Sequence, residues 1–428
     1  MDVSNENKLI LLCSRPKVSE SALNQVKELV KLPLDWEEVL ESASWHGVAP
    51  LLYHNLKGLY LSFAIPQKAM GQLKKAYHEN LARNMYLYNE LDRILESFDA
   101  KGINIIVLKG AALAGTVYGN IALRPMNDID LLVKEEDIAY TEKTMSELGY
   151  LFQGEKPLEW YRENHFHLAY IHPEKNVLVE IHWHIGRKSH PSQIALTDTG
   201  IIKRWWERAQ SLQIANRKAL MLSPDDLIFH LSLHFLKHRF MSQGRDFKSV
   251  FTSRWALIQL CDIFLAINYY GDKINWTSLE LESERCGVNG PVLSTLYIVG
   301  KFMGNADDSY KSAVYEFTQK GLDKGLIELM ERRLFIREDA IPGILFQSML
   351  TDEFYNKLKI LLRGVFPQPE VLSKKYSLSL SSKRLYLYYL IRPFVVLLKY
   401  RKLIWKVLRS RKEIKEEIKL NKWMNSKN

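Results

Sequence analysis

The chain has 428 residues, 47% of them hydrophobic and 25% charged, which predicts a globular protein of two or three domains and excludes a low-complexity chain. Its net charge of +10 comes from residues 384–428, which hold 13 of the 59 Lys and Arg but 3 of the 49 Asp and Glu. The remaining residues hold 46 charges of each sign, which argues against a nucleic-acid binder that uses its whole surface.

The three cysteines, Cys13, Cys261 and Cys286, have no paired spacing. This argues against a disulfide framework and a cysteine-based metal site, and predicts a reducing, cytoplasmic setting. The first 16 residues carry Asp2 and Glu6 and only a short apolar run, so we expect no signal peptide. No uncharged apolar stretch approaches the ~20 residues that a membrane-spanning helix needs.

Helices are predicted throughout residues 1–80, which we expect to form an N-terminal helical region. Apolar residues at helical spacing predict a helix over Asp35–Leu52 that breaks at Gly47. A long helix is predicted over roughly Gln72–Phe98, with its end at Lys101-Gly102.

The pattern then changes to short apolar runs, which predict an α+β fold with a small mixed-sheet core over residues 81–190. The expected strands are Ile103–Leu108, Ile129–Val133, His165–Ile171 and Val177–Trp183, and the expected helices are Ala111–Tyr118 and Glu135–Leu148. The turn His172–Asn176 between the last two strands is a hairpin signal.

After Gly186 the chain is predicted to be helical again, as a C-terminal domain over residues 191–372. Ser223-Pro224-Asp225-Asp226 is a typical helix start, with the helix running to about Phe240. Further helices are expected at Trp255–Tyr270, Gly290–Met303, Asp323–Arg337 and Phe354–Arg363. Residues 373–428 are expected to be a polar linker and a basic amphipathic tail.

The motif Asp128-Ile129-Asp130 inside an apolar run is the strongest sign of chemistry. In a strand, alternation places both carboxylates on one face. Two adjacent ionised carboxylates need a cation between them, and their usual purpose is to hold Mg²⁺ against nucleotide phosphates. A bare pair of solvated acids is the alternative, but the apolar flanks favour the metal site.

Glu180 is a lone acid in the second strand of the predicted hairpin, and it is the candidate third carboxylate. If its strand lies beside the Asp128 strand, the three carboxylates form a catalytic metal site. His182 lies on the same face and can contact a phosphate or act as an acid or base. The alternative for His182 is a hydrogen-bonded strand residue.

Lys109 and Gly110 open the helix that follows the first strand, where free backbone N–H groups and a lysine charge suit a triphosphate. Arg124 is a candidate phosphate clamp, with a surface arginine as the alternative. His230, His234 and His238 share one helix face. They are weak candidates for a zinc site because no acidic ligand follows at the spacing of known zinc motifs. Packing residues, or residues that line the nucleotide site, are therefore favoured.

The basic tail has apolar residues at helical spacing, with Lys and Arg filling its other face. This pattern is typical of a helix on an anionic membrane surface or of an arm that binds RNA or another partner. A helix docked on its own domain is the alternative.

Together these motifs resemble the bacterial "uncharacterised nucleotidyltransferase" family of the polymerase-beta-like superfamily. The resemblance is carried by Leu108-Lys109-Gly110, Tyr118-Gly119-Asn120, the run Leu123–Val133, and Glu180-Ile181-His182-Trp183, and it extends to about residue 376. It implies that Gly110 takes the phosphate-loop position, that Asp128 and Asp130 are the metal pair, and that Glu180 is the third acid. Ala111 stands where the superfamily usually has serine, and the gap from Gly110 to Asp128 is longer than usual.

We therefore expect an enzyme that uses one or two Mg²⁺ ions to transfer a nucleoside monophosphate from a nucleoside triphosphate, such as ATP, to an unidentified acceptor, with release of pyrophosphate. Two alternatives remain open. One is a non-catalytic nucleotide-binding scaffold, held at a membrane or a partner by its tail. The other is a phosphotransferase that moves only the γ-phosphate.

Overall fold

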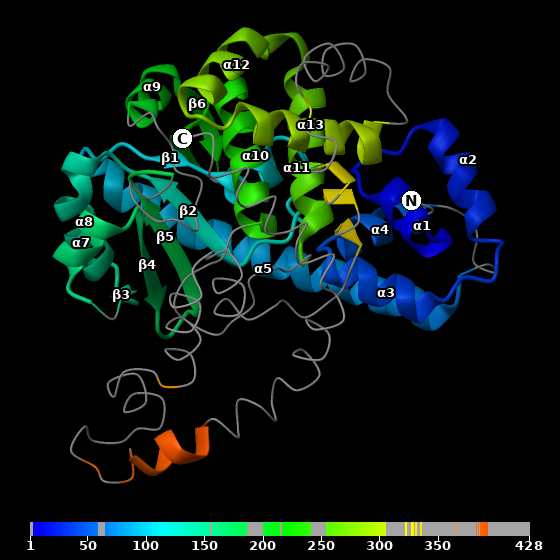
Figure 1. The fold of residues 1–428 in the computed structure, drawn as a ribbon, viewed down its shortest axis with the longest axis horizontal. Coiled ribbons are helices and arrows are strands. Elements are labelled where there is room, and N and C mark those ends of the chain that lie inside the picture. Colours follow the sequence, from blue (N-terminus) through cyan, green and yellow to red (C-terminus); the bar gives the residue numbers. More distant parts are fainter. Residues whose placement is uncertain are drawn as a thin grey trace. The chain divides into compact units, whose positions relative to one another are not determined.

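The computed structural model describes residues 3–58, 65–154, 156–185, 200–214, 216–240 and 254–304, and isolated positions between 322 and 392. Contacts divide the chain into two units, of which the first holds residues 1–237 and 253–337. The second holds residues 238–252 and 338–427, and its longest described segment is a helical stretch at residues 386–392. Helices α1–α13 and strands β1–β7, most of which are labelled in Figure 1, lie in the first unit, apart from the end of α10.

Four short helices and one long helix form the N-terminal part of the first unit. They are α1 (Asn5–Cys13), α2 (Glu20–Leu29), α3 (Trp36–Trp45), α4 (Ala49–Leu56) and α5 (Gln67–Asp99). The side chain of Asp35 caps α3 by accepting from two backbone N–H groups, and Gly47, with φ +72°, separates α3 from α4. The predicted break at Gly47 is therefore confirmed. Helix α5 begins at Gln67, after Pro66, five residues before the predicted start.

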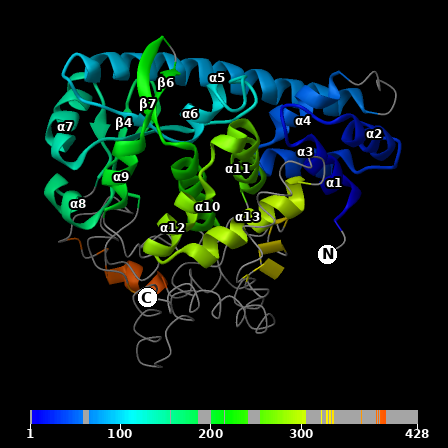
Figure 2. The ribbon, with the colours of Figure 1, turned by 90° about the horizontal axis from the view of Figure 1, so that it is seen from above.

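The sheet has seven strands in the order β3-β4-β5-β2-β1-β7-β6. The strands are β1 (Ile106–Val107), β2 (Asp128–Leu132), β3 (Leu151–Phe152), β4 (His167–His172), β5 (Val177–His182), β6 (Gln210–Ile214) and β7 (Arg217–Met221). Strand β2 is parallel to β5 and antiparallel to β1. The predicted α+β class, with a small mixed sheet and a hairpin, is thus confirmed, and Figure 2 shows α5 running from α3 and α4 to this sheet.

The elements between these strands are α6 (Lys109–Gly115), the 3₁₀ turn η1 (Glu135–Asp137), α7 (Ile138–Glu147) and α8 (Leu158–Asn164). Helix α6 begins two residues before the predicted start at Ala111 and ends before Tyr118, whose N–H donates to the Leu113 carbonyl. The predicted strand Ile103–Leu108 is reduced to two residues in β1.

The expectation of helix throughout the region after Gly186 is wrong for β6 and β7. Strand β7 pairs in parallel with β1, and the Leu220 N–H donates to the Ile105 carbonyl at 3.1 Å. The pairing partner lies more than a hundred residues earlier in the chain, so no local pattern predicts it. The sheet therefore extends beyond residue 190, and the limits given above for the domains stay a prediction.

The helices that follow are α9 (Ile201–Arg208), α10 (Pro224–Phe240), α11 (Ala256–Tyr270), α12 (Trp276–Arg285) and α13 (Asn289–Met303), with the 3₁₀ turn η2 (Gly271–Lys273) after α11. The predicted helices at α10, α11 and α13 are confirmed within one residue at their starts. The predicted helix at 354–363 lies outside the described residues, and the one at 323–337 is described only in part.

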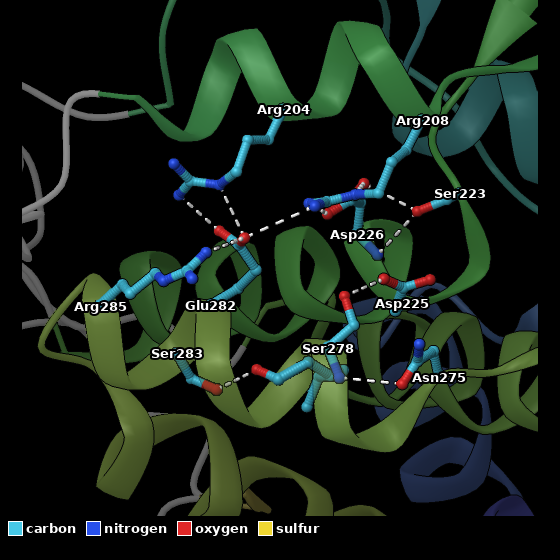
Figure 3. Close-up of polar contacts among 11 residues, drawn as sticks. Arg204, Arg208, Ser223, Asp225, Asp226, Asn275, Ser278, Glu282, Ser283 and Arg285 are labelled. Atoms are coloured by element: carbon cyan, nitrogen blue, oxygen red, sulfur yellow. Dashed lines mark hydrogen bonds and ion pairs between the residues drawn. The ribbon is translucent and has the colours of Figure 1, made fainter.

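A polar network joins α9 to α10 and α12 (Figure 3). Arg204 donates two hydrogen bonds of 2.7 Å to the buried carboxylate of Glu282, and Arg208 donates in the same bidentate way to Asp226 at 2.6 and 2.9 Å. Ser223 adds a hydrogen bond to Asp226 at the start of α10. Because each buried carboxylate has a matching guanidinium, these ion pairs fix the position of α9 without an unpaired charge.

All three cysteines are free thiols in buried positions. None of the helices among the described residues is long and apolar enough to cross a bilayer. Most of the predicted basic tail, residues 393–428, lies outside the described part of the chain.

Candidate active site

The site is built on the pairing of two neighbouring strands. In the parallel register of β2 and β5, Asp130 is the partner of Glu180, and Asp128 is the partner of Leu178. Paired residues point to the same side of a sheet, and residues two apart on one strand do as well. The register therefore places Asp128, Asp130 and Glu180 on one face, as the sequence predicted.

Asp130 is the centre of this cluster, with 4% of its surface exposed. Its Oδ1 atom lies 2.6 Å from Nζ of Lys109 and 3.0 Å from Nε2 of His182. The same His182 nitrogen lies 3.4 Å from Oε2 of Glu180. The four side chains thus form a continuous polar group, and the alternative of two solvated acids at a strand end is wrong for Asp130.

The three carboxylates have different affinities for protons. Burial acts to raise the pKa of Asp130, but Lys109 and His182 beside it hold that pKa well below its ordinary value. Glu180 also has a lowered pKa, since a hydrogen bond with His182 and the charge of Lys109 outweigh its burial. For Asp128, burial and the nearby charge of Asp130 raise the pKa to about 7. The cluster carries more negative charge than Lys109 alone balances.

Lys109 occupies an unusual backbone conformation at the junction of β1 and α6. Its φ of 47° lies in the left-handed region, which costs a residue with a Cβ atom about 1 kcal/mol or more. Burial would lower the pKa of its ammonium group, but the charges of Asp130, Glu180 and Asp128 raise it instead. The strained turn thus directs a fully charged amine into the carboxylate cluster.

Gly110 packs against the side chain of Arg124. A Cβ atom at Gly110 would lie 2.3 Å from Nη1 of Arg124 and 2.9 Å from Cγ of Met126. This close approach requires glycine at position 110, a reason that could not be identified from the sequence. Whether the Gly110 backbone also meets a phosphate stays a prediction.

Arg124 is buried, with 6% of its surface exposed, so the alternative of a surface arginine is wrong. Its Nε and Nη2 atoms donate to the two carboxylate oxygens of Asp262 at 3.2 and 2.7 Å, and Nη1 donates to the Pro125 carbonyl at 2.9 Å. The Tyr118 hydroxyl donates to the same Asp262 at 2.8 Å. Each nitrogen of the guanidinium already has a protein partner. This favours a structural role for Arg124, in addition to the predicted contact with phosphate.

The loop that leads into β2 is held by two buried asparagines of α5. Asn80 donates to the Ala122 carbonyl at 2.7 Å, and Asn84 donates to the Arg124 carbonyl at 2.8 Å. Sequence reasoning gave no role to these asparagines or to Asp262. A partial signal was present, since these residues lie on helix faces whose other buried residues are mostly apolar.

Two histidines of α10, His230 and His234, lie in packed surroundings. His230 is 6% exposed, and its ring contacts Trp205 edge-on at 5.5 Å and stacks on His234 at 6.4 Å. His234 Nδ1 lies 3.4 Å from the side-chain amide of Gln259. The side chain of His238 lies outside the described residues, so a role for this face beside the nucleotide stays a prediction.

Within the described part of the chain, one group of side chains could hold a metal ion. Asp130, Glu180 and His182 each offer a ligand atom, and these atoms lie within 4.8 Å of one another. Asp128, predicted to form the metal pair with Asp130, is on the same face but is not in this group. The group can supply two anionic oxygen donors and one imidazole nitrogen.

Comparisons with known proteins agree with the resemblance in the motifs. The family described as "Uncharacterised nucleotidyltransferase" matches residues 33–304 of the chain. A comparison with curated proteins finds no match. The predicted membership in the uncharacterised nucleotidyltransferase family is thereby confirmed.

Two solved structures show partial similarity. One is the antibiotic-resistance factor ANT(2'')-Ia, 14% identical, covering 47% of this chain and 91% of its own, with a TM-score of 0.31. The other is an antigenic nucleotidyltransferase-like protein from Paracoccidioides brasiliensis, 15% identical, covering 54% of this chain and 96% of its own, with a TM-score of 0.33.

Proposed function

Because the chain belongs to the uncharacterised nucleotidyltransferase family, we propose that it transfers a nucleoside monophosphate from a nucleoside triphosphate to an acceptor hydroxyl. The observation that carries this proposal is the register of β2 and β5, with Asp130 opposite Glu180 and Lys109 bound to Asp130. Two carboxylates and a lysine at one point of a sheet suit a substrate that carries phosphates and a divalent cation.

The proposed cation ligands are Asp128, Asp130 and Glu180, with one or two Mg²⁺ ions as the expected cofactor. The residues fit this role, because carboxylate oxygens are the donors that Mg²⁺ prefers and the single ammonium group of Lys109 faces all three carboxylates. When bound, the cation would neutralise phosphate charge and stabilise the attacking and leaving oxygens of an in-line displacement.

Lys109 is the proposed phosphate contact, since its charged amine lies beside the carboxylates that would hold the cation. Gly110, Arg124 and His182 are the further predicted substrate contacts. For Arg124 the proposal is indirect, because its pairing with Asp262 fixes the loop between α6 and β2.

In the proposed reaction, an acceptor oxygen forms a bond to the α-phosphorus as the bond from that phosphorus to the bridging oxygen breaks. Pyrophosphate leaves, and the acceptor proton passes to a carboxylate of the cluster. The chain's contribution is to hold the triphosphate and the acceptor in line, which accounts for much of the catalysis in phosphoryl and nucleotidyl transfer.

The test is incubation of the full chain with α-³²P-labelled triphosphates, Mg²⁺ and cell lysate, followed by separation of the products. We expect a labelled acceptor and free pyrophosphate. Asp130→Asn keeps the shape of the side chain but removes its charge, so transfer should fall by at least about a hundredfold. Glu136→Gln, at an exposed acid in η1, is the matched control and should leave transfer unchanged.

Each other outcome has a definite meaning. Nucleoside diphosphate in place of pyrophosphate would identify a phosphotransferase that uses the same site. Nucleotide binding without any labelled product would identify a scaffold. Full transfer by Asp130→Asn would remove Asp130 from the catalytic group.

We also propose that residues 384–428 hold the protein at an anionic membrane surface within the cytoplasm. Support comes from the net charge of +10 on this segment and from the exposed apolar residues at its described start, Tyr386, Leu387 and Leu390. An arm that binds RNA is the alternative outcome of the test described in the Discussion.

A further inference from the structure

The metal-ligating group of this site includes an imidazole, which an all-oxygen magnesium site does not need. His182 reaches the cluster because its strand, β5, pairs in parallel with β2, with His182 opposite Leu132 and Glu180 opposite Asp130. The side chain of His182 is 5% exposed, and its Nε2 atom is directed between the two carboxylates. A buried nitrogen donor therefore lies beside one buried oxygen donor, from Asp130, and one half-buried oxygen donor, from Glu180.

Two of the three separations among these atoms match those of ligands around one ion, and the third is at most 4.8 Å. Two atoms that each lie about 2.1 Å from a shared ion are ~3.0 Å apart at a right angle and ~3.4 Å apart at the tetrahedral angle. The Nε2 atom of His182 lies 3.0 Å from Oδ1 of Asp130 and 3.4 Å from Oε2 of Glu180. Both distances fall within this range, so a small shift of the side chains would bring all three within reach of a single cation.

The kind of donor decides the kind of cation. Magnesium takes oxygen ligands almost exclusively, whereas imidazole nitrogen favours first-row transition ions. We infer that Asp130, Glu180 and His182 form a mixed-donor site for a divalent first-row transition ion, for which Mn²⁺ serves as the paramagnetic probe. The inference rests on the proposed metal role of Asp130 and Glu180, and it adds His182 as a ligand and a chemical class for the ion. Asp128 lies outside this group, so on its side of the cluster the available ligand atoms are carboxylate oxygens.

The arrangement around Glu180 supports the same assignment. A second imidazole, that of His167 on β4, has its Nε2 atom 4.0 Å from the other Glu180 oxygen, and its ring centroid is 5.1 Å from that of His182. Outer imidazoles and carboxylates commonly orient the ligands of a transition ion. Glu180 thus lies between two histidines, one on its own strand and one on the neighbouring strand.

The test is Mn²⁺ binding to the full chain, measured by electron paramagnetic resonance without nucleotide. Pulsed measurement of the wild-type complex should show coupling of Mn²⁺ to a histidine nitrogen, and ¹⁵N-labelled histidine should change that coupling. His182→Asn should abolish the coupling and weaken Mn²⁺ binding by about tenfold or more, since even outer partners of a metal contribute about 10–100-fold. Mg²⁺ affinity, measured by competition, should change much less.

His78→Asn makes the same substitution at an exposed histidine of α5 and should change neither readout. A wild-type Mn²⁺ complex without nitrogen coupling would overturn the inference, whether or not His182→Asn folds. Coupling that persists in His182→Asn would overturn it as well. This test can be distinguished from the test of the proposed function. If Mn²⁺ couples to a histidine nitrogen but the chain labels no acceptor, only the metal site is supported. If the chain labels an acceptor but shows no such coupling, only the proposed enzyme activity is supported.

Discussion

Lys109 combines a strained backbone with a buried charge at the centre of the site. Its φ of 47° and its 2.6 Å contact with Asp130 both follow from its place at the end of β1, where the chain turns into α6. A lysine in this position is both a counter-ion for the carboxylates and a candidate ligand for phosphate. These two roles have opposite consequences for metal and nucleotide binding.

Replacement of Lys109 by glutamine should separate the two roles. Without the ammonium group, a cation no longer competes with Lys109 for Asp130, so Mn²⁺ or Mg²⁺ should bind several-fold more tightly. Nucleoside triphosphate should bind more weakly, by about tenfold, because a phosphate contact is lost. Calorimetric titration with each ligand measures both effects, and Lys74→Gln at an exposed site of α5 is the control. If nucleotide affinity does not fall, the assignment of Lys109 to phosphate is wrong, and if metal affinity does not rise, its role as a counter-ion is wrong.

At the scale of elements, the start of α6 and the loop before β2 are packed against each other through Gly110 and Arg124. The position of Arg124 depends in turn on Asp262, which lies 138 residues further along the chain in α11. The loop is also fixed by the two asparagines of α5. Strand β2 is therefore positioned by helices that precede it and follow it in the sequence.

Two glycine substitutions should have opposite effects on stability. Gly110→Ala places a Cβ atom 2.3 Å from the guanidinium of Arg124, so it should destabilise the protein by about 1–3 kcal/mol. Gly71→Ala lies inside α5, where nothing lies within 4 Å of the added Cβ, so it should stabilise by up to ~1 kcal/mol. Chemical denaturation measures both. Equal effects of the two variants would contradict the close packing of Gly110.

Removal of the Asp262 carboxylate should destabilise the protein through its effect on Arg124. Asp262→Ala leaves the buried Arg124 without its partner, which typically costs about 3–5 kcal/mol. The double variant Arg124→Leu with Asp262→Leu removes both charges, so it should recover part of this loss. Denaturation curves of the two variants test the coupling. A double variant less stable than Asp262→Ala would show that the pair is not the reason for the loss.

At the scale of the whole molecule, the distribution of charge separates the tail from the rest. Residues 384–428 carry a net +10, whereas the remainder is neutral. Each Lys or Arg near an anionic membrane contributes about 1 kcal/mol, so a few engaged residues suffice for measurable attachment. Salt should weaken such binding.

Truncation after Lys383 should leave nucleotide affinity intact and abolish sedimentation with vesicles that contain phosphatidylserine. Neutral phosphatidylcholine vesicles are the control for the full chain. An insoluble truncated protein, or one that no longer binds nucleotide, would indicate that the tail is docked on its own domain. A full chain that ignores vesicles but shifts RNA in a gel would indicate an arm that binds nucleic acid.

The sequence by itself determined the local features of this protein. The helix break at Gly47, the start of α10 at Ser223-Pro224 and the hairpin around residues 172–176 follow from residue preferences that act within a few positions. The motif Asp128-Ile129-Asp130 could also be recognised from the sequence, because two acids in an apolar strand usually serve to bind a metal ion.

Only the tertiary structure decided which of these residues meet. The parallel register of β2 and β5 places Glu180 and His182 beside Asp130, and the addition of β6 and β7 to the sheet depends on their pairing with β1. The pairing of Arg124 with Asp262 likewise joins residues far apart in the chain. The local sequence around one of these residues does not indicate which distant residue it will contact, since strand pairing and burial depend on long-range packing.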